Sequence, residues 1–301
     1  AAGGGAAAAA AETGRGRGAP FGRQAAAVAR RATLQLRRSP ALLALTVKSN
    51  IMLALLVGAI FYQLDVSVAG LENRAGAFFF ITMNVVYMNT STVGHFHTEK
   101  AMFVHEKMNG YYSVPAYFLA KLFAHLLPMQ VIPTSLFALI SYFMIGLRSG
   151  VEPVVYFVLI LCLASIASAS MGFFFGTLVS KPSIGNLLFS LLSTLMLVGA
   201  GFLMKMDDLG AWAKWLPHVS IFRYIMEGLS INEFSGNPLF IENPEMPTIC
   251  SEAEAYLLKH GYGDEDGEDR ARKIICIKML GQIALVSLLG TYMNLRRMKR
   301  T

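Results

Sequence analysis

The sequence predicts an all-α membrane protein with six transmembrane helices, and two observations carry this prediction. Hydrophobic residues make up 54% of the 301 residues and charged residues only 15%, against the roughly 25% charged residues of a soluble domain. The apolar residues also fall into six separate stretches, each long enough for the about 20 residues that cross a bilayer. The lipid bilayer is therefore the first expected partner, and no nucleic-acid partner is expected.

The predicted spans are joined by short loops and by one long outer loop. The spans cover residues 44–64, 75–95, 115–146, 153–178, 184–204 and 274–295, and the loop covers residues 205–273. Arginine and lysine gather before the first span and in the tail from Arg296 to Arg300, whereas the loop contains the acidic run Asp264–Asp269. Because basic flanks mark the cytoplasmic side, both termini are predicted to be cytoplasmic.

Two segments precede the first span. Residues 1–23 are rich in Ala and Gly with scattered arginines and lack the hydrophobic pattern needed to pack, which indicates a linker or the edge of a fragment. An organelle transit peptide is the alternative, disfavoured because Ser is nearly absent. Residues 24–38 then predict a basic amphipathic helix with Val28, Arg31 and Leu34 near one face, suited to a membrane surface. A solvated helix beside the membrane would have the same pattern.

A short polar helix is predicted between the second and third spans, from Glu99 to Tyr112. Thr98 is placed to cap its start, and Asn109-Gly110 is placed to end it. Its apolar stripe comprises Ala101, Val104, Met108 and Tyr112, and its water-facing residues are Glu99, Lys100, Glu106 and Lys107. An interfacial helix joined by one turn to a spanning helix could transmit a push from a soluble partner, although a plain interfacial helix remains the alternative.

Polar residues recur within the apolar spans. Helical spacing places Asn84, Tyr87, Met88 and Ser91 on one face of the second span, and Ser190, Ser193, Thr194, Leu197 and Gly201 on one face of the fifth. Such residues either line a cavity or form hydrogen bonds between helices, and the spacing leaves both open. The ladder of small residues Ala164, Ser168, Gly172 and Gly176 in the fourth span predicts close helix packing.

Histidines and cysteines give weaker signals. His95, His97 and Glu99 could bind zinc, but residues two apart do not share a helical face, so no metal site is expected. Cys162 and Cys276 fall within spans. Cys250 falls in the outer loop, where an odd thiol suggests a disulfide between two copies of the chain, or a free thiol.

Several separated blocks resemble one family. The run FVHEKMNGYYSVPAYFLAKLFAHLLPMQVIPTSLFALISYFMIGL, from Phe103 to Leu147, is similar to the white/brown and breast-cancer-resistance-protein type half-transporters, subfamily G of the ATP-binding-cassette (ABC) transporters. Further blocks in the same order are Glu72–Gly76, Ile221–Tyr224, Asn232–Phe234 and Glu254–Leu257.

This resemblance implies an ABC-2 type transmembrane domain over residues 24–301. The basic helix would be a connecting helix, and residues 208–230 a re-entrant hairpin with Trp212, Trp215 and Tyr224 at the membrane interface. The coupling helix, which contacts the nucleotide-binding domain, would comprise Glu99, Lys100, Phe103, Glu106, Lys107, Tyr111 and Tyr112. Loop disulfides of the family lie near Cys250, but no partner cysteine occurs near residue 240.

The resemblance also implies a substrate cavity. Its expected residues are Asn84, Tyr87, Met88, Ser91, Gln130, Ser190, Thr194 and Leu197, of which Asn84 and Tyr87 would hold the substrate and Gln130 would influence its selection. Phe202 and Leu203 match the paired leucines that close the cavity. Gln130 also lies beside Pro128 and Pro133, where its amide could instead satisfy backbone groups freed by the prolines.

No phosphate-binding loop G-x-x-x-x-G-K-[ST] occurs in the 301 residues, so the chain itself is not expected to hydrolyse ATP. ATP and Mg are expected at a nucleotide-binding domain that lies upstream in the full protein or in another polypeptide. The expected function is export of hydrophobic or amphipathic molecules (lipid, sterol or xenobiotic) by alternating access, as a homo- or heterodimer in the plasma membrane. The alternatives are a non-transporting scaffold that pairs with full-length half-transporters and, less favoured, an ATP-independent channel.

Overall fold

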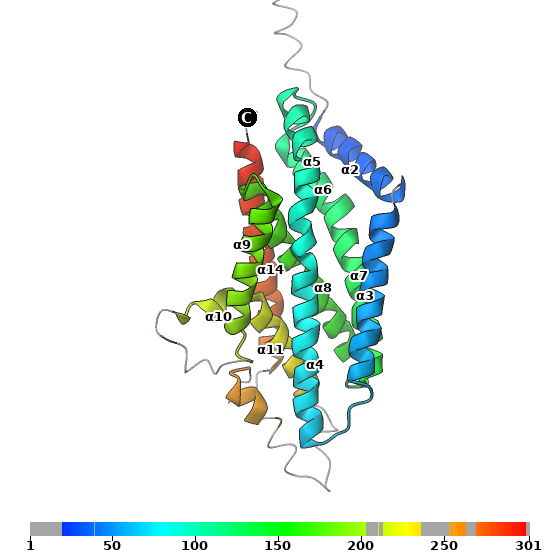
Figure 1. The fold of residues 1–301 in the computed structure, drawn as a ribbon, viewed down its shortest axis with the longest axis vertical. Coiled ribbons are helices and arrows are strands. Elements are labelled where there is room, and N and C mark those ends of the chain that lie inside the picture. Colours follow the sequence, from blue (N-terminus) through cyan, green and yellow to red (C-terminus); the bar gives the residue numbers. More distant parts are fainter. Residues whose placement is uncertain are drawn as a thin grey trace, which may run out of the picture.

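The computed structural model describes residues 20–38, 40–202, 210, 213–235, 253, 255–262 and 269–298. Within these ranges every regular element is a helix, which confirms the all-α class. The long helices run roughly side by side along the longest axis (Figure 1). Residues 1–19, parts of the outer loop including Trp212 and Cys250, and Leu203 lie outside the described residues.

The amphipathic helix and the first span are separate helices. α2 (Phe21–Arg38) crosses one end of the bundle, and α3 (Pro40–Ile60) descends from it along α7 (Figure 1). The face of α2 that meets the bundle buries Val28 and Ala32, whereas Leu34 is exposed. The helix therefore docks through small and branched side chains.

The second span differs most from its prediction. α4 (Val68–Tyr87), the 3-10 turn η2 (Met88–Thr90) and α5 (Ser91–Met108) follow one another without a loop. The prediction that a separate helix begins at Glu99 was therefore wrong. Thr98 does not cap a helix, because it lies inside α5 and its hydroxyl donates to the carbonyl of Gly94. The predicted end was correct, since α5 stops before Asn109 and Gly110 takes a φ of +72°.

The third span contains a π-helical segment. α6 (Val114–Lys121), η3 (Leu122–Leu126) and α7 (Leu127–Ile145) form one continuous helical path. The π segment lies just before Pro128, where a proline removes a backbone donor. Pro133 is accommodated within α7.

α8 lies at the centre of the bundle. α8 (Val151–Leu178) packs against α14 (Asp269–Arg297), α7 and α5. Its small-residue ladder faces the α4–α5 junction, because a Cβ on Gly172 would lie 3.0 Å from the Thr92 hydroxyl and one on Gly176 2.9 Å from the Val93 carbonyl. The predicted packing role of the ladder is thus confirmed.

Two short helices follow the fifth apolar helix, α9 (Pro182–Val198). α10 (Leu216–Val219) and α11 (Ile221–Phe234) lie at the end of the bundle opposite α2 (Figure 1). Trp215 is exposed, as an interfacial residue would be, but Tyr224 is buried and its hydroxyl donates to the carbonyl of His218. The expected interfacial position of Tyr224 was therefore wrong.

Among the described residues, four stretches are long and apolar enough to cross a membrane: Leu43–Ile60, Val114–Ile145, Val151–Leu178 and Arg270–Arg297. α9 is apolar but shorter, and α4 is not among the four. The protein is therefore an α-helical membrane protein, and the number six stays a prediction. α2 and the C-terminal end of α14 lie at the same end of the bundle (Figure 1), as an even number of crossings requires.

Candidate functional site

The predicted cavity residues of the second and fifth spans meet at one contact. The hydroxyl oxygens of Tyr87 on α4 and Thr194 on α9 lie 3.2 Å apart, and the Tyr87 ring lies 5.9 Å from the ring of Phe222 on α11. Asn84, one turn before Tyr87, has a buried amide nitrogen with no hydrogen-bond partner in the described part of the chain. Ser190 accepts from Thr194 through its carbonyl, so this group forms a connected polar face.

Three further predicted cavity residues line a different space, whereas Leu197 packs partly buried against the main apolar core. Met88, Ser91 and Gln130 border a polar cavity of about 50 Å³ among α3, α7, α8 and the α4–α5 junction. This volume suits about one or two water molecules, not a cargo molecule, for which pockets of about 300–1,000 Å³ are typical. A larger apolar groove of about 540 Å³ lies along α8, α9 and α14, but none of the predicted residues lines it.

A buried polar network beside the small cavity was missed by the sequence reasoning. The amide of Asn89 donates to Ser168 (2.8 Å), and Ser165 donates to the side-chain carbonyl of Gln130 (2.8 Å) and accepts from Thr134 (3.1 Å). Gln130 is therefore a partner of a side chain on α8 and not, in this contact, of a backbone group freed by the prolines, while its role in substrate selection stays a prediction. The available signal was a set of polar residues on each of the two helices. One sequence does not show which residues of two helices lie opposite each other.

Phe202, the described half of the predicted gate, belongs to an aromatic stack. Its ring lies 4.9 Å from the Phe79 ring at an interplanar angle of 22°, and 6.4 Å from the His260 ring. Offset aromatic pairs of this kind stabilise a fixed arrangement by about 0.5–1.5 kcal/mol. Phe202 therefore packs against the middle of α4 and the segment before α14.

The C-terminal half of α5 is joined to α2 by an ion pair. Both carboxylate oxygens of Glu106 accept from the Arg31 guanidinium, at 2.6 and 3.1 Å. This bond raises the pKa of Arg31 and lowers the pKa of Glu106 below its usual range, because both charged forms are favoured. Glu106 was expected to face water, but 18% of its side chain is exposed, so that expectation was wrong.

The same helix is joined to α6 by a second ion pair. Lys121 donates to Glu99 at 2.6 Å, and the Tyr117 hydroxyl reaches the other Glu99 oxygen at 3.4 Å. The Tyr117 ring lies between Phe103 (centroids 4.5 Å apart) and Tyr112 (5.4 Å, stacked). α5 is thus fixed to the start of the third span by charge and by aromatic packing.

Lys107 was also expected to face water, and this expectation was wrong. Its ammonium donates to the backbone carbonyls of Leu295, Arg296 and Met298, at 2.8, 3.0 and 2.7 Å. The expected stripe was wrong at Met108, which is 55% exposed, and Phe103 is the fully buried residue among the described side chains from Glu99 to Met108. Of the other residues expected to couple, Lys100 is half-buried and Tyr111 is exposed.

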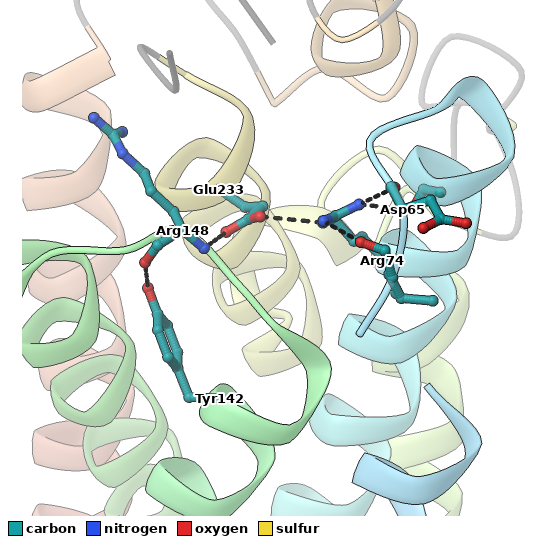
Figure 2. A network of polar contacts seen from close by, with 7 residues as sticks. Asp65, Arg74, Tyr142, Arg148 and Glu233 are labelled. Carbon is teal, nitrogen blue, oxygen red and sulfur yellow. Dashed lines mark hydrogen bonds and ion pairs between the residues drawn. The ribbon is translucent and has the colours of Figure 1, made fainter. Parts of the chain in front are cut away.

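A second polar cluster lies at the opposite end of the bundle (Figure 2). Arg74 on α4 donates to Glu233 on α11 at 3.2 Å, and to the carbonyls of Leu64 and Asp65 at 2.8 Å each. The other Glu233 oxygen accepts from the backbone N–H of Arg148, in the connection between α7 and α8. Both charged side chains are almost fully buried, so this cluster joins three parts of the chain.

No group of three His, Cys, Asp or Glu side chains that could hold a metal ion occurs among the described residues. His95, His97 and Glu99 all lie within α5, so no unwound segment gathers them. His97 instead has its ring nitrogens 3.1 and 3.2 Å from the carbonyls of Val93 and Val179.

The apolar helices, their buried polar contacts and the charged helix that joins three neighbours at one end define a multi-pass α-helical membrane protein with the layout of a transporter domain. The ABC-2 type transporter family matches residues 23–234, more than half of the chain. The chain therefore belongs to this family, as an ABC-2 type membrane domain of subfamily G of the ABC transporters.

Several relatives support this assignment. The chain is 34% identical to the mouse broad substrate specificity ATP-binding cassette transporter ABCG2 over 209 residues. This match covers 69% of this chain and 32% of that protein. The chain is 34% identical over 219 residues to Dictyostelium discoideum ABC transporter G family member 24 (72% of this chain, 19% of that protein). It is 30% identical over 210 residues to protein white of Ceratitis capitata (69% and 31%). The chain thus spans about a third or less of these relatives.

Proposed function

We propose that this chain is the transmembrane half of an ATP-driven exporter that moves hydrophobic or amphipathic molecules, such as a lipid, a sterol or a xenobiotic. The observation that carries the proposal is the position of α5, which contacts α2 through Glu106 near its C-terminal end and α6 through Glu99 at its middle. A helix joined by ion pairs to its neighbours moves them when it is displaced, because stretching a charge-assisted hydrogen bond costs more than moving the pair together.

The proposed mechanism is alternating access. A nucleotide-binding domain presses on α5 from the cytoplasm, and the displacement reaches α7 through the Glu99–Lys121 pair and the aromatic contacts of Tyr117. The third span is suited to respond, because its π-helical segment at Leu122–Leu126 is a point at which helices commonly change direction. Both termini are cytoplasmic in this proposal, and the plasma membrane is the proposed location.

The cargo cavity is proposed to form between two copies of the chain, or between this chain and a related half-transporter. A single copy has too small a polar cavity for cargo beside Gln130, whereas Tyr87 is half-buried and Thr194 exposed on the α4–α9 face. Pairing of two such faces would surround a molecule with Asn84, Tyr87, Thr194 and Leu197. Because these four side chains carry no charge, no strong preference for charged cargo is proposed.

ATP and Mg are assigned to a nucleotide-binding domain, not to this sequence. The phosphate-binding motif does not occur in the 301 residues. Cys250 is proposed to form a disulfide between two copies. The second candidate function, a scaffold that pairs with complete half-transporters, would keep the helix contacts without moving cargo.

The experiment reverses the charges of the α2–α5 pair in the full-length transporter, reconstituted in proteoliposomes with ATP and a fluorescent amphipathic dye. Arg31→Glu and Glu106→Arg are each expected to lower ATP-dependent dye transport severalfold, and the double variant to recover most of it. Arg30→Glu is the matched control, since Arg30 is exposed on the same helix and has no ion-pair partner among the described residues. If both single variants transported dye as fast as the unchanged protein, α5 would have no coupling role through this pair. If the unchanged protein hydrolysed ATP without transporting dye, the scaffold function would be favoured.

A further inference from the structure

Lys107 makes an unusual contact for a residue expected to meet a partner protein. Its ammonium lies within 2.7–3.0 Å of three backbone carbonyls, those of Leu295, Arg296 and Met298. All three belong to the last turn of α14 or follow it directly. The three donors of a lysine are thereby matched by three acceptors, so its hydrogen-bonding capacity is used within the chain.

The chemistry of a helix end explains this contact. The last four carbonyls of an α-helix lack intrahelical partners and carry the negative end of the helix dipole, so a cation near them is stabilising. The two arginines of that turn, Arg296 and Arg297, are exposed. Lys107 therefore supplies from α5 the positive charge that satisfies the end of α14, 188 to 191 residues away in sequence.

The contact matters because the backbones of α5 and α14 otherwise approach one another little. Apolar packing accompanies it, since Leu295 and Phe103 of α5 are buried in the same apolar cluster, together with residues of α2, α6 and α8. α14 packs mainly on α8 along its length and on α11 at the opposite end. Near its C-terminal end it also contacts α6, where the rings of Phe118 and Tyr292 lie 5.8 Å apart, and α8, where the Asn294 amide donates to the Thr177 hydroxyl at 3.2 Å. The C-terminal end of α14 is therefore held by α5, α6 and α8 together, and Lys107 supplies its hydrogen bonds to α5.

We infer that Lys107 is a positioning residue that makes the C-terminal end of α14 move with α5, so that the helix pressed by the nucleotide-binding domain displaces the sixth span as well as the third. This inference rests on the proposed function. Glu106 and Lys107, adjacent in sequence, then direct the same displacement to α2 and to α14. The competing role is that of a plain helix cap, which would stabilise α14 without transmitting motion.

The test measures the distance between α5 and α14 by pulsed electron paramagnetic resonance on the full-length transporter in nanodiscs. Spin labels are placed at Met102→Cys and Met293→Cys, both exposed in the structure, after the native cysteines of the full-length protein are replaced. Lys107→Met removes the charge at similar side-chain volume. Lys107→Arg keeps N–H donors, and Lys181→Met removes an exposed lysine near the same end that has no side-chain partner among the described residues.

The inference expects one narrow distance that is the same in the nucleotide-free and ATP-trapped states, because the two helices move together. Lys107→Met should broaden the distribution at least about twofold and lower transport per ATP hydrolysed about tenfold, the ratio that corresponds to about 1.4 kcal/mol. Lys107→Arg should restore both quantities, and Lys181→Met should change neither.

Three results separate the inference from the proposed function. An unchanged distance distribution in Lys107→Met would overturn the inference, and so would a broadened distribution with full transport per ATP, which would leave Lys107 as a cap alone. A protein with native Lys107 that moves no dye with ATP would contradict the proposed function, whereas the nucleotide-free distance would still show whether Lys107 holds α14.

Discussion

Arg74 and Glu233 lie 159 residues apart in the chain and form an ion pair whose side chains are only 1% and 2% exposed. Each member also has backbone partners: Arg74 donates to the carbonyls of Leu64 and Asp65, and Glu233 accepts from the N–H of Arg148 (Figure 2). The pair therefore joins α4, α11 and the α7–α8 connection at the end of the bundle opposite α5. Burial is tolerated because nearly all donors and acceptors are satisfied.

Removal of either member of this pair should destabilise the fold strongly. Arg74→Met or Glu233→Gln leaves a buried polar partner uncompensated, which costs about 3–5 kcal/mol when a buried pair is broken. We expect each variant to lower the Tm in detergent by at least about 6 °C, at roughly 2 °C per kcal/mol for a chain of this size. The measurement is fluorescence-detected thermal unfolding of the purified protein.

The control for this prediction is Glu72→Gln, which alters an exposed carboxylate two residues from Arg74. Its Tm should stay within about 1 °C, since surface substitutions change stability by about 0.5 kcal/mol or less. A double variant, Arg74→Met with Glu233→Met, should be less destabilised than the sum of the single changes. Strict additivity would show that the two side chains act independently.

The class of the protein could be predicted because it depends on composition and on lengths of apolar sequence. Helix boundaries were less predictable where local signals compete. Thr98 looked like a cap before Glu99, but a threonine hydroxyl inside a helix can donate to the carbonyl four residues back, and Thr98 does so with Gly94. α4 and α5 therefore continue into one another through η2.

The candidate site was less predictable than the fold, for a related reason. Periodicity shows which face of a helix a residue occupies, but it does not show which residue of another helix lies opposite. Glu106 and Lys107 were expected in water because they are charged, yet each meets a helix from a distant part of the sequence. Asn89 gave no signal of its own, and its partner Ser168 looked like a packing residue alone.

The small-residue ladder of α8 predicts a size limit at Gly176. A Cβ at this position would lie 2.9 Å from the carbonyl oxygen of Val93, which belongs to the backbone and cannot move by changing a rotamer. Gly176→Ala should therefore cost about 1–3 kcal/mol, as overpacked cores do. The change would be measured as a lower Tm and as a larger population of aggregated protein in size-exclusion chromatography.

Gly94→Ala is the matched control, because nothing lies within 4 Å of a Cβ built on that helical glycine. Alanine is favoured over glycine in helices by about 1 kcal/mol, so this variant should be as stable as the unchanged protein or more stable. If Gly176→Ala matched it, close approach of α8 and α5 would not depend on the ladder.

The Arg31–Glu106 pair predicts a pH dependence with a definite sign. The guanidinium lowers the pKa of Glu106 below its ordinary value of 4.5, so the folded state holds this proton less tightly than the unfolded state does. The pair therefore stabilises the fold above pH 4.5, and this contribution is lost as the pH falls through the lowered pKa. It should amount to about 1 kcal/mol or less, because Arg31 is 45% exposed.

The measurement compares the Tm of the unchanged protein with that of Glu106→Gln between pH 7 and pH 3. The difference should be greatest near neutral pH, shrink below pH 4.5, and be smaller in high salt, which screens exposed charges. Glu152→Gln, at an exposed residue at the start of α8, should show no such trend. A Tm difference that grows toward acidic pH would contradict the assigned sign.

Variants of Tyr87 can distinguish its proposed role in binding cargo from a role in packing α4 against α9. Tyr87→Phe keeps the ring but removes the hydroxyl that lies 3.2 Å from Thr194, so it should cost about 0.6 kcal/mol of stability, the mean for hydrogen bonds between membrane helices. Tyr87→Ala also removes the ring, and should raise the transport KM for flat aromatic cargo by about tenfold, or about 1.4 kcal/mol, with less effect on non-aromatic cargo. Tyr62→Ala, at an exposed ring after α3, is the control. A Tyr87→Ala variant with unchanged KM for every cargo would leave Tyr87 with an interhelical role alone.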